Sequence, residues 1–256
     1  FTREMKITML EVCVDSLESA INAIRGGADE LELCSALDIG GLTPSAGLVK
    51  EIKAEPAETR TKVNIMLRCR GGNDFNYTDK EMDTMLADLE IFKQLNVDRF
   101  VFGALTEFQQ IDIGKSLKIV TTANTIPVTF HRAFDLCTDP MRSMKTIVEL
   151  EFDRLLTSGQ QPLASDPEAI KLITKLVEYY GKNIKIMPGS GVNTSNVKSF
   201  IDIGCKILHS SCKKRRDLPG NFEGKVFSLG GKDEVYVTDI NMVREMKELL
   251  KMYYHK

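Results

Sequence analysis

Carboxylates and thiols recur at a fixed spacing in two segments of this sequence, Leu10-Glu11-Val12-Cys13 and Leu31-Glu32-Leu33-Cys34. Side chains alternate across a β-strand, so Glu11 and Cys13 share one face of the first segment, and the second segment repeats the arrangement. In parallel strands covered by helices, the face toward the helices is apolar, which turns the acidic and thiol face toward a barrel interior. Burial of carboxylates is unfavourable without partners. The sequence therefore predicts matching cations in the same interior.

Basic residues on other predicted strands supply such cations. With apolar residues facing outward, Arg68, Arg70 and His131 point inward, where they could form an ion network with Glu11 and Glu32. An ordinary barrel fills its interior with branched aliphatic side chains and carries its active site at the carboxyl ends of the strands. The five residues therefore form a candidate catalytic cluster. The alternative is a network that only satisfies its own charges.

Two thiols, Cys13 and Cys34, lie two residues beyond the glutamates and nearer the predicted mouth. Thiolates are soft ligands that suit Cu(I) and zinc, and a pair on adjacent strands could bind a monovalent soft ion. Spacing alone favours the alternative of two small buried hydrophobes, because two ligands fall short of a four-ligand structural site. The six cysteines contain no C-x-x-C pair, which argues against a disulfide framework. His209-x-x-Cys212 resembles metal-ligand spacing, but such a pair points to opposite faces of a strand, so an ordinary loop histidine is expected.

A glycine-rich turn, Gly189-Ser190-Gly191, follows the seventh predicted strand. A backbone of this kind can approach an anion closely, and barrel phosphate sites use the loops after strands seven and eight. Ser210 and Ser211, with His209, would complete an anion-binding site. The alternative is a simple tight turn. The basic run at 213–216 could attract phosphate or act as a nuclear address, although such residues in a polar loop are more often only solvated.

The arrangement of short and long patterns along the chain indicates the fold. Helical patterns alternate with eight short apolar or alternating runs, and helix start signals include the capping box Thr78-x-x-Glu81, Asp139-Pro140 and Asp166-Pro167. The short runs lie at 9–15, 30–34, 63–70, 99–104, 127–131, 154–157, 184–187 and 206–209. Eight alternations in 256 residues predict a single-domain (β/α)8 barrel of the TIM type over residues 1–256.

Two segments near the C-terminus lead to separate expectations. Residues 213–238 show no helical pattern and are predicted to form an irregular loop, or extra elements, over or beside the barrel mouth. A helix is expected to begin near Thr194 and a final helix near Asp239. The final helix has an apolar stripe at helical spacing, which we expect to pack on its own barrel. The stripe consists of Ile240, Val243, Met246, Leu250 and Tyr253.

Composition narrows the classes of partner. A net charge of -2 and an isoelectric point near 6.0 give no global electrostatic reason to bind nucleic acid or a membrane surface. No apolar run reaches the length that spans a bilayer, and the first residues lack the regions of a signal peptide. A cytoplasmic protein with small ligands is expected, with the basic run leaving a nuclear location open.

Several motifs taken together resemble the CutC copper-homeostasis family. They are Glu11-Val-Cys-Val-Asp-Ser16, Glu30-Leu-Glu-Leu-Cys34, Gly40-Gly-Leu-Thr-Pro-Ser45, Phe102-Gly-Ala-Leu105 and Pro127-Val-Thr-Phe-His-Arg-Ala-Phe-Asp135. The resemblance implies a cytosolic (β/α)8 barrel that binds Cu(I), takes part in copper handling and assembles into homo-oligomers. The cysteines proposed as copper ligands in eukaryotic members correspond to Cys13 and Cys34. The family motif Arg-Pro-Arg-Gly-Gly-Asp-Phe departs here to Arg68-Cys-Arg-Gly-Gly-Asn-Asp-Phe75, with one extra residue.

The sequence therefore favours a copper-homeostasis protein that binds Cu(I) through Cys13 and Cys34. A different class of function stays open, namely an enzyme that acts on a small anionic substrate, such as a phosphorylated one, at the carboxyl ends of the strands. Such an enzyme would use a glutamate or His131 as the acid-base group and Arg68 or Arg70 to hold the anion.

Overall fold

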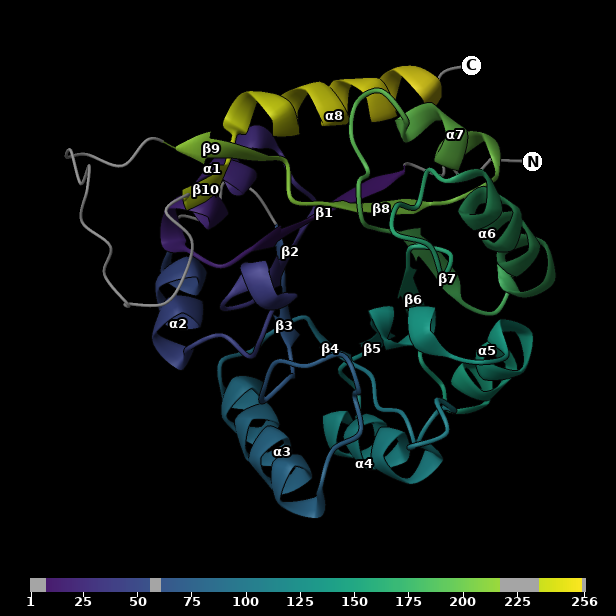
Figure 1. Cartoon of the computed structure of the whole chain (residues 1–256). Helices are drawn as coiled ribbons and strands as arrows, with labels where there is room; N and C mark the ends of the chain where they lie inside the picture. Colours follow the sequence, from purple (N-terminus) through teal and green to yellow (C-terminus); the bar gives the residue numbers. More distant parts are fainter. Residues whose placement is uncertain (1–7, 56–60, 217–234, 255–256) are drawn as a thin grey trace, which may run out of the picture.

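Eight parallel strands form the inner wall of a barrel in this computed structural model, which describes residues 8–55, 61–216 and 235–254 (Figure 1). The strands are β1 (Met9–Val14), β2 (Glu30–Leu33), β3 (Lys62–Met66), β4 (Arg99–Phe102), β5 (Val128–Phe130), β6 (Arg154–Thr157), β7 (Lys185–Pro188) and β8 (Ile207–Ser210). Their order in the sheet is β7-β6-β5-β4-β3-β2-β1-β8, and β7 contacts β8, so the circle is nearly closed. The predicted TIM-type (β/α)8 fold is confirmed.

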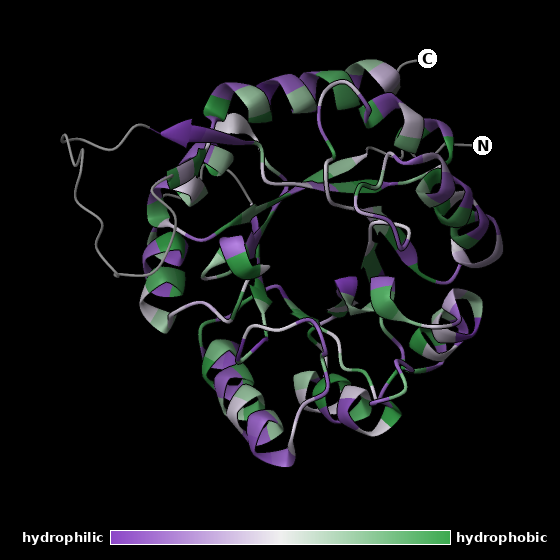
Figure 2. Cartoon of the chain, viewed as in Figure 1, coloured by the Kyte–Doolittle hydropathy of each residue, from purple (hydrophilic) through white to green (hydrophobic). Residues whose placement is uncertain are grey.

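Helices surround this barrel on the outside (Figure 1). They are α1 (Leu17–Gly26), α2 (Ala46–Ala54), α3 (Asp79–Gln94), α4 (Ile113–Ala123), α5 (Pro140–Glu149), α6 (Pro167–Tyr180), α7 (Val197–Asp202) and α8 (Ile240–Tyr254), with short 3-10 turns η1 (Leu37–Ile39) and η2 (Arg132–Leu136). The helix ribbons alternate between hydrophilic and hydrophobic colours in Figure 2, as expected for helices with one face on a core. The strand side chains that face them, such as Leu10 and Val12, are fully buried.

The predicted helix start signals operate as expected in most cases. At α3, the Thr78 hydroxyl accepts a hydrogen bond from the Glu81 backbone N–H (3.2 Å), and the Glu81 carboxylate accepts one from the Thr78 N–H (2.7 Å). The expectation of a helix from Thr194 is wrong by three residues. The Asn193 side chain accepts a hydrogen bond from the Ser195 N–H (2.9 Å), and this local turn delays the start of α7.

The segment after β8 contains regular structure at its two ends, which agrees with extra elements there rather than with an irregular loop. Its ends form an antiparallel pair of strands, β9 (Lys213–Arg216) and β10 (Val235–Thr238), and β10 contacts α1 beside the barrel. Residues 217–234 lie outside the described part of the chain. The basic run forms exposed β9, where Lys213 lies over the Tyr236 ring and Arg216 pairs with Glu18.

The apolar stripe of α8 packs on its own barrel, as predicted. Val243, Met246 and Leu250 are buried, and α8 contacts α1, α7 and β1. Gly26, the last residue of α1, lies so close to α8 that a Cβ atom there would be 2.5 Å from the Val243 Cβ. The close approach of these two helices therefore requires glycine at this position.

We predict that Gly26→Ala lowers the free energy of unfolding by roughly 1 to 3 kcal/mol, because a rigid Cβ would overpack the contact between α1 and α8. Urea denaturation measures this. Gly47→Ala is the matched control, since Gly47 is an exposed glycine of α2 whose added Cβ meets no atom within 3.4 Å. The control should be neutral or stabilising by up to about 1 kcal/mol. Equal stability of the Gly26→Ala variant and the wild type would contradict the packing account.

Candidate functional site

The register between β1 and β2 decides which chemical groups face each other. Glu11 lies opposite Glu30, and Cys13 lies opposite Glu32. The two similar segments are therefore offset by two residues, as the tilt of strands in a barrel produces. Cys34 follows the end of β2. Because Cys13 lies opposite Glu32, Cys34 lies two residues farther toward the carboxyl ends of the strands than Cys13 does.

A fully buried ion network fills the part of the barrel interior farther from the carboxyl ends of the strands. We call this part, formed by Glu11, Glu30, Asn64 and Arg154, the lower layer. Arg154 donates to Glu11 at 3.0 Å and to Glu30 at 2.8 Å, and the Asn64 amide donates to Glu30 at 2.7 Å. The predicted cation for these carboxylates exists, but it is Arg154 of β6 rather than Arg68 or His131. The alternation of Arg154 with Leu155 along β6 is the signal that could have identified it. Neither Glu11 nor Arg154 lines the cavity described below.

The carboxyl groups of this lower layer have different protonation behaviour. Burial alone would raise the pKa of Glu30, but the hydrogen bonds and charge of Arg154 outweigh this and lower the pKa to about 2. Burial dominates at Glu11, where the pKa is raised despite Arg154, since the nearby Glu32 charge acts in the same direction. Glu30 is therefore the more acidic of the two carboxyl groups that contact Arg154.

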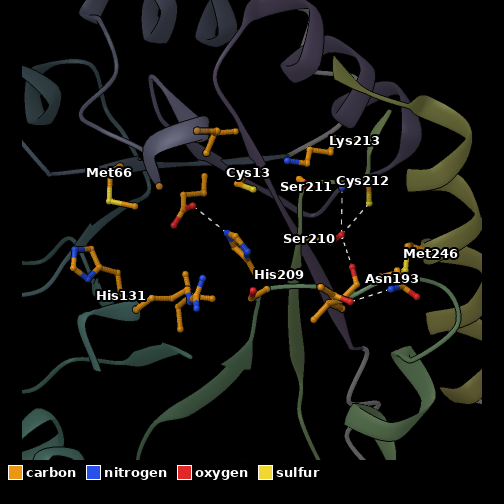
Figure 3. A pocket seen from close by; sticks show the side chains of 18 of the residues that line it. Cys13, Met66, His131, Asn193, His209, Ser210, Ser211, Cys212, Lys213 and Met246 are labelled. Carbon is orange, nitrogen blue, oxygen red and sulfur yellow. Dashed lines mark hydrogen bonds and ion pairs between the residues drawn. The ribbon is translucent and has the colours of Figure 1, made fainter. Parts of the chain in front are cut away.

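A cavity of about 460 Å³ opens above this layer, at the carboxyl ends of the strands (Figure 3). Among its lining residues are Cys13, Glu32, Arg68, His131 and His209. Three predicted members of the catalytic cluster, Glu32, Arg68 and His131, are thus brought to one cavity. Figure 3 shows His131 at one side of the cavity, with His209 nearer Cys13.

His209 belongs to the cavity wall and not to a loop, which corrects the expectation from sequence. It lies on β8, and its Nε2 is 3.0 Å from the Glu32 carboxylate and 4.0 Å from that of Glu11. Burial would lower the pKa of His209, but the Glu32 charge and hydrogen bond raise it above the usual value. Cys212 lines the same cavity, but it is not one of the donor groups near the His209 imidazole, and its thiol lies 3.6 Å from the Ser210 hydroxyl.

A group of potential metal ligands forms where Cys13, Glu32 and His209 meet. The Cys13 sulfur, a Glu32 carboxylate oxygen and an imidazole nitrogen of His209 lie within 4.8 Å of one another. Cys34 is fully buried against Met66, and its thiol donates to the Glu32 carboxylate at 3.8 Å. Burial and the Glu32 charge hold the pKa of both thiols well above the usual range, so both are protonated in the metal-free protein.

Arg70 does not join the cluster, which corrects the sequence prediction. Regular strand alternation ends with β3 at Met66, and the Arg70 side chain pairs with Asp74 and Glu81 while its guanidinium lies 5.5 Å from the centre of the Tyr77 ring. The hydrogen bonds of Asp74 and Glu81 raise the Arg70 pKa further. Its interactions stabilise the loop after β3 and the start of α3.

The glycine-rich turn after β7 lies at the same cavity, which Ser190, Gly191, Ser210 and Ser211 line. The Ser190 hydroxyl donates to the Pro162 carbonyl and the Ser210 hydroxyl donates to the Val192 carbonyl, both at 2.8 Å. These two protons are therefore not free for an anion. A Cβ on Gly189 would lie 2.6 Å from the Leu156 Cδ1 and 3.2 Å from the His209 Nδ1, so Gly189 provides room for neighbouring side chains. Anion binding at this turn stays a prediction.

The fold and this cavity define a TIM-type barrel with thiol, imidazole and carboxylate groups at its mouth. The CutC family matches residues 8–214, and the chain belongs to that family. The human copper homeostasis protein cutC homolog is 39% identical over 249 residues, which cover 95% of this chain and 89% of the human protein. The Caenorhabditis elegans homolog of the same name is 38% identical over 253 residues, covering 97% and 98%.

A solved structure gives the same result. The crystal structure of a CutC protein from Streptococcus agalactiae matches with a TM-score of 0.74 and 33% sequence identity, covering 80% of this chain and 99% of that chain. The resemblance drawn from the sequence motifs is thereby confirmed. Within the ranges that the structure describes, no helix has the length and apolar character needed to cross a membrane.

We predict that acid destabilises the wild type more steeply than a Glu30→Gln variant. The folded-state pKa of Glu30, about 2, lies below its ordinary value of 4.5. The stabilisation is therefore present above about pH 4.5 and is lost as the pH falls toward about 2, which amounts to roughly 3 kcal/mol for this group. Urea denaturation across this pH range measures the loss.

The control is Glu248→Gln, a change at an exposed carboxylate of α8. It should keep the steep acid dependence of the wild type. If Glu30→Gln were as acid-sensitive as the wild type, the charge of Glu30 would not be what balances Arg154.

Proposed function

We propose that this chain binds Cu(I) at the barrel mouth, with the thiolates of Cys13 and Cys34 as ligands and the His209 imidazole as a third donor beside Cys13. The observation that carries the proposal is the approach of Cys13, Glu32 and His209 donor atoms to within 4.8 Å of one another. Thiolate and imidazole are ligands that suit copper. The relatives named copper homeostasis proteins support the choice of this metal.

Metal binding at this position is coupled to proton release. Both thiols are protonated without metal, so each thiolate ligand must release its proton when the metal binds. Binding of one Cu(I) by both thiolates therefore exchanges two protons for one cation, and the Cu(I) affinity should rise with pH.

The alternative enzyme has less support in its predicted form. Two of the five residues in its predicted cluster are not at the cavity, because Glu11 is sealed in the lower layer and Arg70 pairs with Asp74 and Glu81. Copper binding requires only groups that line the cavity or touch Glu32.

The state of the cysteines supports a cytoplasmic location, which is part of this proposal. All six cysteines lie in the described part of the chain and all six are free thiols. Free thiols persist in reducing compartments such as the cytosol. Cu(I) is also the oxidation state of copper that soft thiolate ligands select.

We predict that a Cys13→Ser/Cys34→Ser variant loses Cu(I) affinity by more than about 100-fold, because changes merely adjacent to metal ligands already cost about 10- to 100-fold. The measurement is an anaerobic titration of Cu(I) against a chromophoric competitor. His209→Gln should weaken binding by a smaller factor, since both sulfurs remain.

Cys69→Ser is the matched control, because Cys69 is a partly buried free thiol that does not line the cavity. Its Cu(I) affinity should equal that of the wild type. Unchanged affinity in the Cys13→Ser/Cys34→Ser variant would refute the proposed ligands, and equal losses in the control would indicate non-specific thiol binding.

A homo-oligomer is the assembly we propose, following the resemblance to the family. Ile113 and Leu117 are large apolar side chains one helical turn apart on α4, and they are 56% and 50% exposed. Such neighbours on one helix face suit contact with a second copy.

We predict that light scattering gives a mass that is a multiple of the 28.7 kDa chain, and that Leu117→Asp lowers it. A charged side chain in an apolar contact is unfavourable, which is the reason for the expected dissociation. A wild-type mass near 28.7 kDa at micromolar concentration would reject the oligomer.

A further inference from the structure

One buried cation at the cavity has no anionic partner among the described residues. The structure contains three buried arginines, Arg68, Arg99 and Arg154, within those ranges. Arg99 pairs with Asp153, and Arg154 pairs with carboxylates of the lower layer. Arg68 has no such carboxylate in the part of the chain described. Buried charges are usually paired, so the missing anion is a specific feature of this cavity.

Backbone carbonyl groups hold the Arg68 guanidinium in place. Its Nη1 donates to the carbonyls of Ile39 and Gly41, both at 3.1 Å, and its Nη2 donates to the carbonyl of Gly72 at 2.7 Å. Its Nε is buried and has no hydrogen-bond partner. The carbonyls therefore fix the group with neutral acceptors and leave its Nε–H without a partner.

His131 presents a second unused donor in the same cavity. Its Nδ1 accepts a hydrogen bond from the Ala133 N–H (3.1 Å), which places the proton of the neutral ring on Nε2. Nε2 is buried and has no hydrogen-bond partner. Burial, and next the charge of Arg68, lower the His131 pKa to about 3, so the ring is neutral at physiological pH. A Cβ on Gly103 would lie 2.5 Å from Nδ1, so glycine there leaves space for the ring.

The Phe75 ring packs against both of these side chains. Its centre lies 5.0 Å from the Arg68 guanidinium carbon and 4.9 Å from the centre of the His131 ring. Phe75 adopts a φ of 49°, a left-handed conformation that is uncommon for an aromatic residue. Strain of this kind is retained where the surroundings fix a side chain in a required position. All three residues line the cavity, and Figure 3 shows His131 on its wall.

We infer that the cavity binds the carboxylate of a small organic acid, whose oxygens accept hydrogen bonds from Arg68 Nε–H and His131 Nε2–H. Two unused donors and one unpaired positive charge match one carboxylate group. Leu37, Met66 and Leu156 line the same cavity and provide apolar contact for a carbon skeleton, which inorganic phosphate lacks. The site uses no thiol, so its donors differ from the proposed copper ligands.

The other charges of the cavity are compatible with an anion at this position. Glu32, a lining carboxylate, belongs to the metal-ligand group and is bonded to His209 at 3.0 Å. Arg132, a second cation on the lining, already pairs with Asp135 at 2.9 Å. Lys213, an exposed third cation on the lining, lies 4.9 Å from the centre of the Tyr236 ring. Arg68 is therefore the buried lining cation without a carboxylate partner within the described ranges.

The test uses the metal-free full chain labelled with ¹⁵N-histidine, with acetate, pyruvate, succinate and inorganic phosphate as probes. Before addition, the His131 nitrogens should show the neutral ring with its proton on Nε2. We expect at least one carboxylate probe to shift the His131 Nε2 resonance in a saturable way, and phosphate to leave it unchanged. Absence of a shift with every carboxylate, or a shift with phosphate alone, would overturn the inference.

Variants identify the donors by calorimetric titration with the carboxylate that shifts His131. His131→Phe keeps the ring against Phe75 but removes the N–H, and Arg68→Gln removes the charge. Each should weaken binding by at least about tenfold, the loss expected for one hydrogen bond to a charged group. Arg244→Gln, the same change at an exposed arginine of α8, should bind as the wild type does. If the Arg68→Gln variant does not fold, the His131→Phe variant provides the test. A carboxylate affinity of His131→Phe equal to that of the wild type would refute the site.

Discussion

The ion network around Arg154 is the interaction on which the barrel interior depends. Its guanidinium links β6 to Glu11 of β1 and Glu30 of β2, on the opposite side of the barrel. Without this cation, two carboxylates would be buried side by side, at a cost that commonly reaches 3 to 5 kcal/mol when one partner of a buried ion pair is removed. The network also occupies the floor beneath Glu32 and His209, so the geometry of the cavity rests on it.

The interior separates into two layers with different electrostatic character. Charges in the lower layer balance one another and are closed to ligands, as in a structural network. The upper layer contains two protonated thiols, the Glu32 to His209 pair and the unpaired Arg68. Exchange of a proton for a metal ion, or recruitment of an anion, is therefore available only in the upper layer. This division explains why residues with similar inward orientation have different roles.

Local patterns predicted the fold because each strand and helix carries its own signal. Alternation along β1 and β2 indicated the inner face correctly, and caps such as Thr78 and Asp139 marked helix starts. Pairing across the barrel could not be predicted this way, because the offset that places Cys13 opposite Glu32 depends on strand tilt. The predicted inward orientation of Arg70 was also wrong, because the prediction extended the strand alternation beyond Met66, where β3 ends.

The polar groups of the upper layer lower the stability of the ligand-free fold, and this loss of stability indicates that they bind a ligand. Aliphatic side chains fill an ordinary barrel interior, and a buried donor without an acceptor destabilises a protein by about 1 to 3 kcal/mol. The unused N–H groups of Arg68 and His131 therefore make the ligand-free fold less stable than an apolar lining would. Arg154 also has a buried Nε without a partner, but its charge is met within the chain and it does not line the cavity. Buried groups that lack an internal partner and line a cavity are those for which a partner from outside the chain supplies the missing interaction.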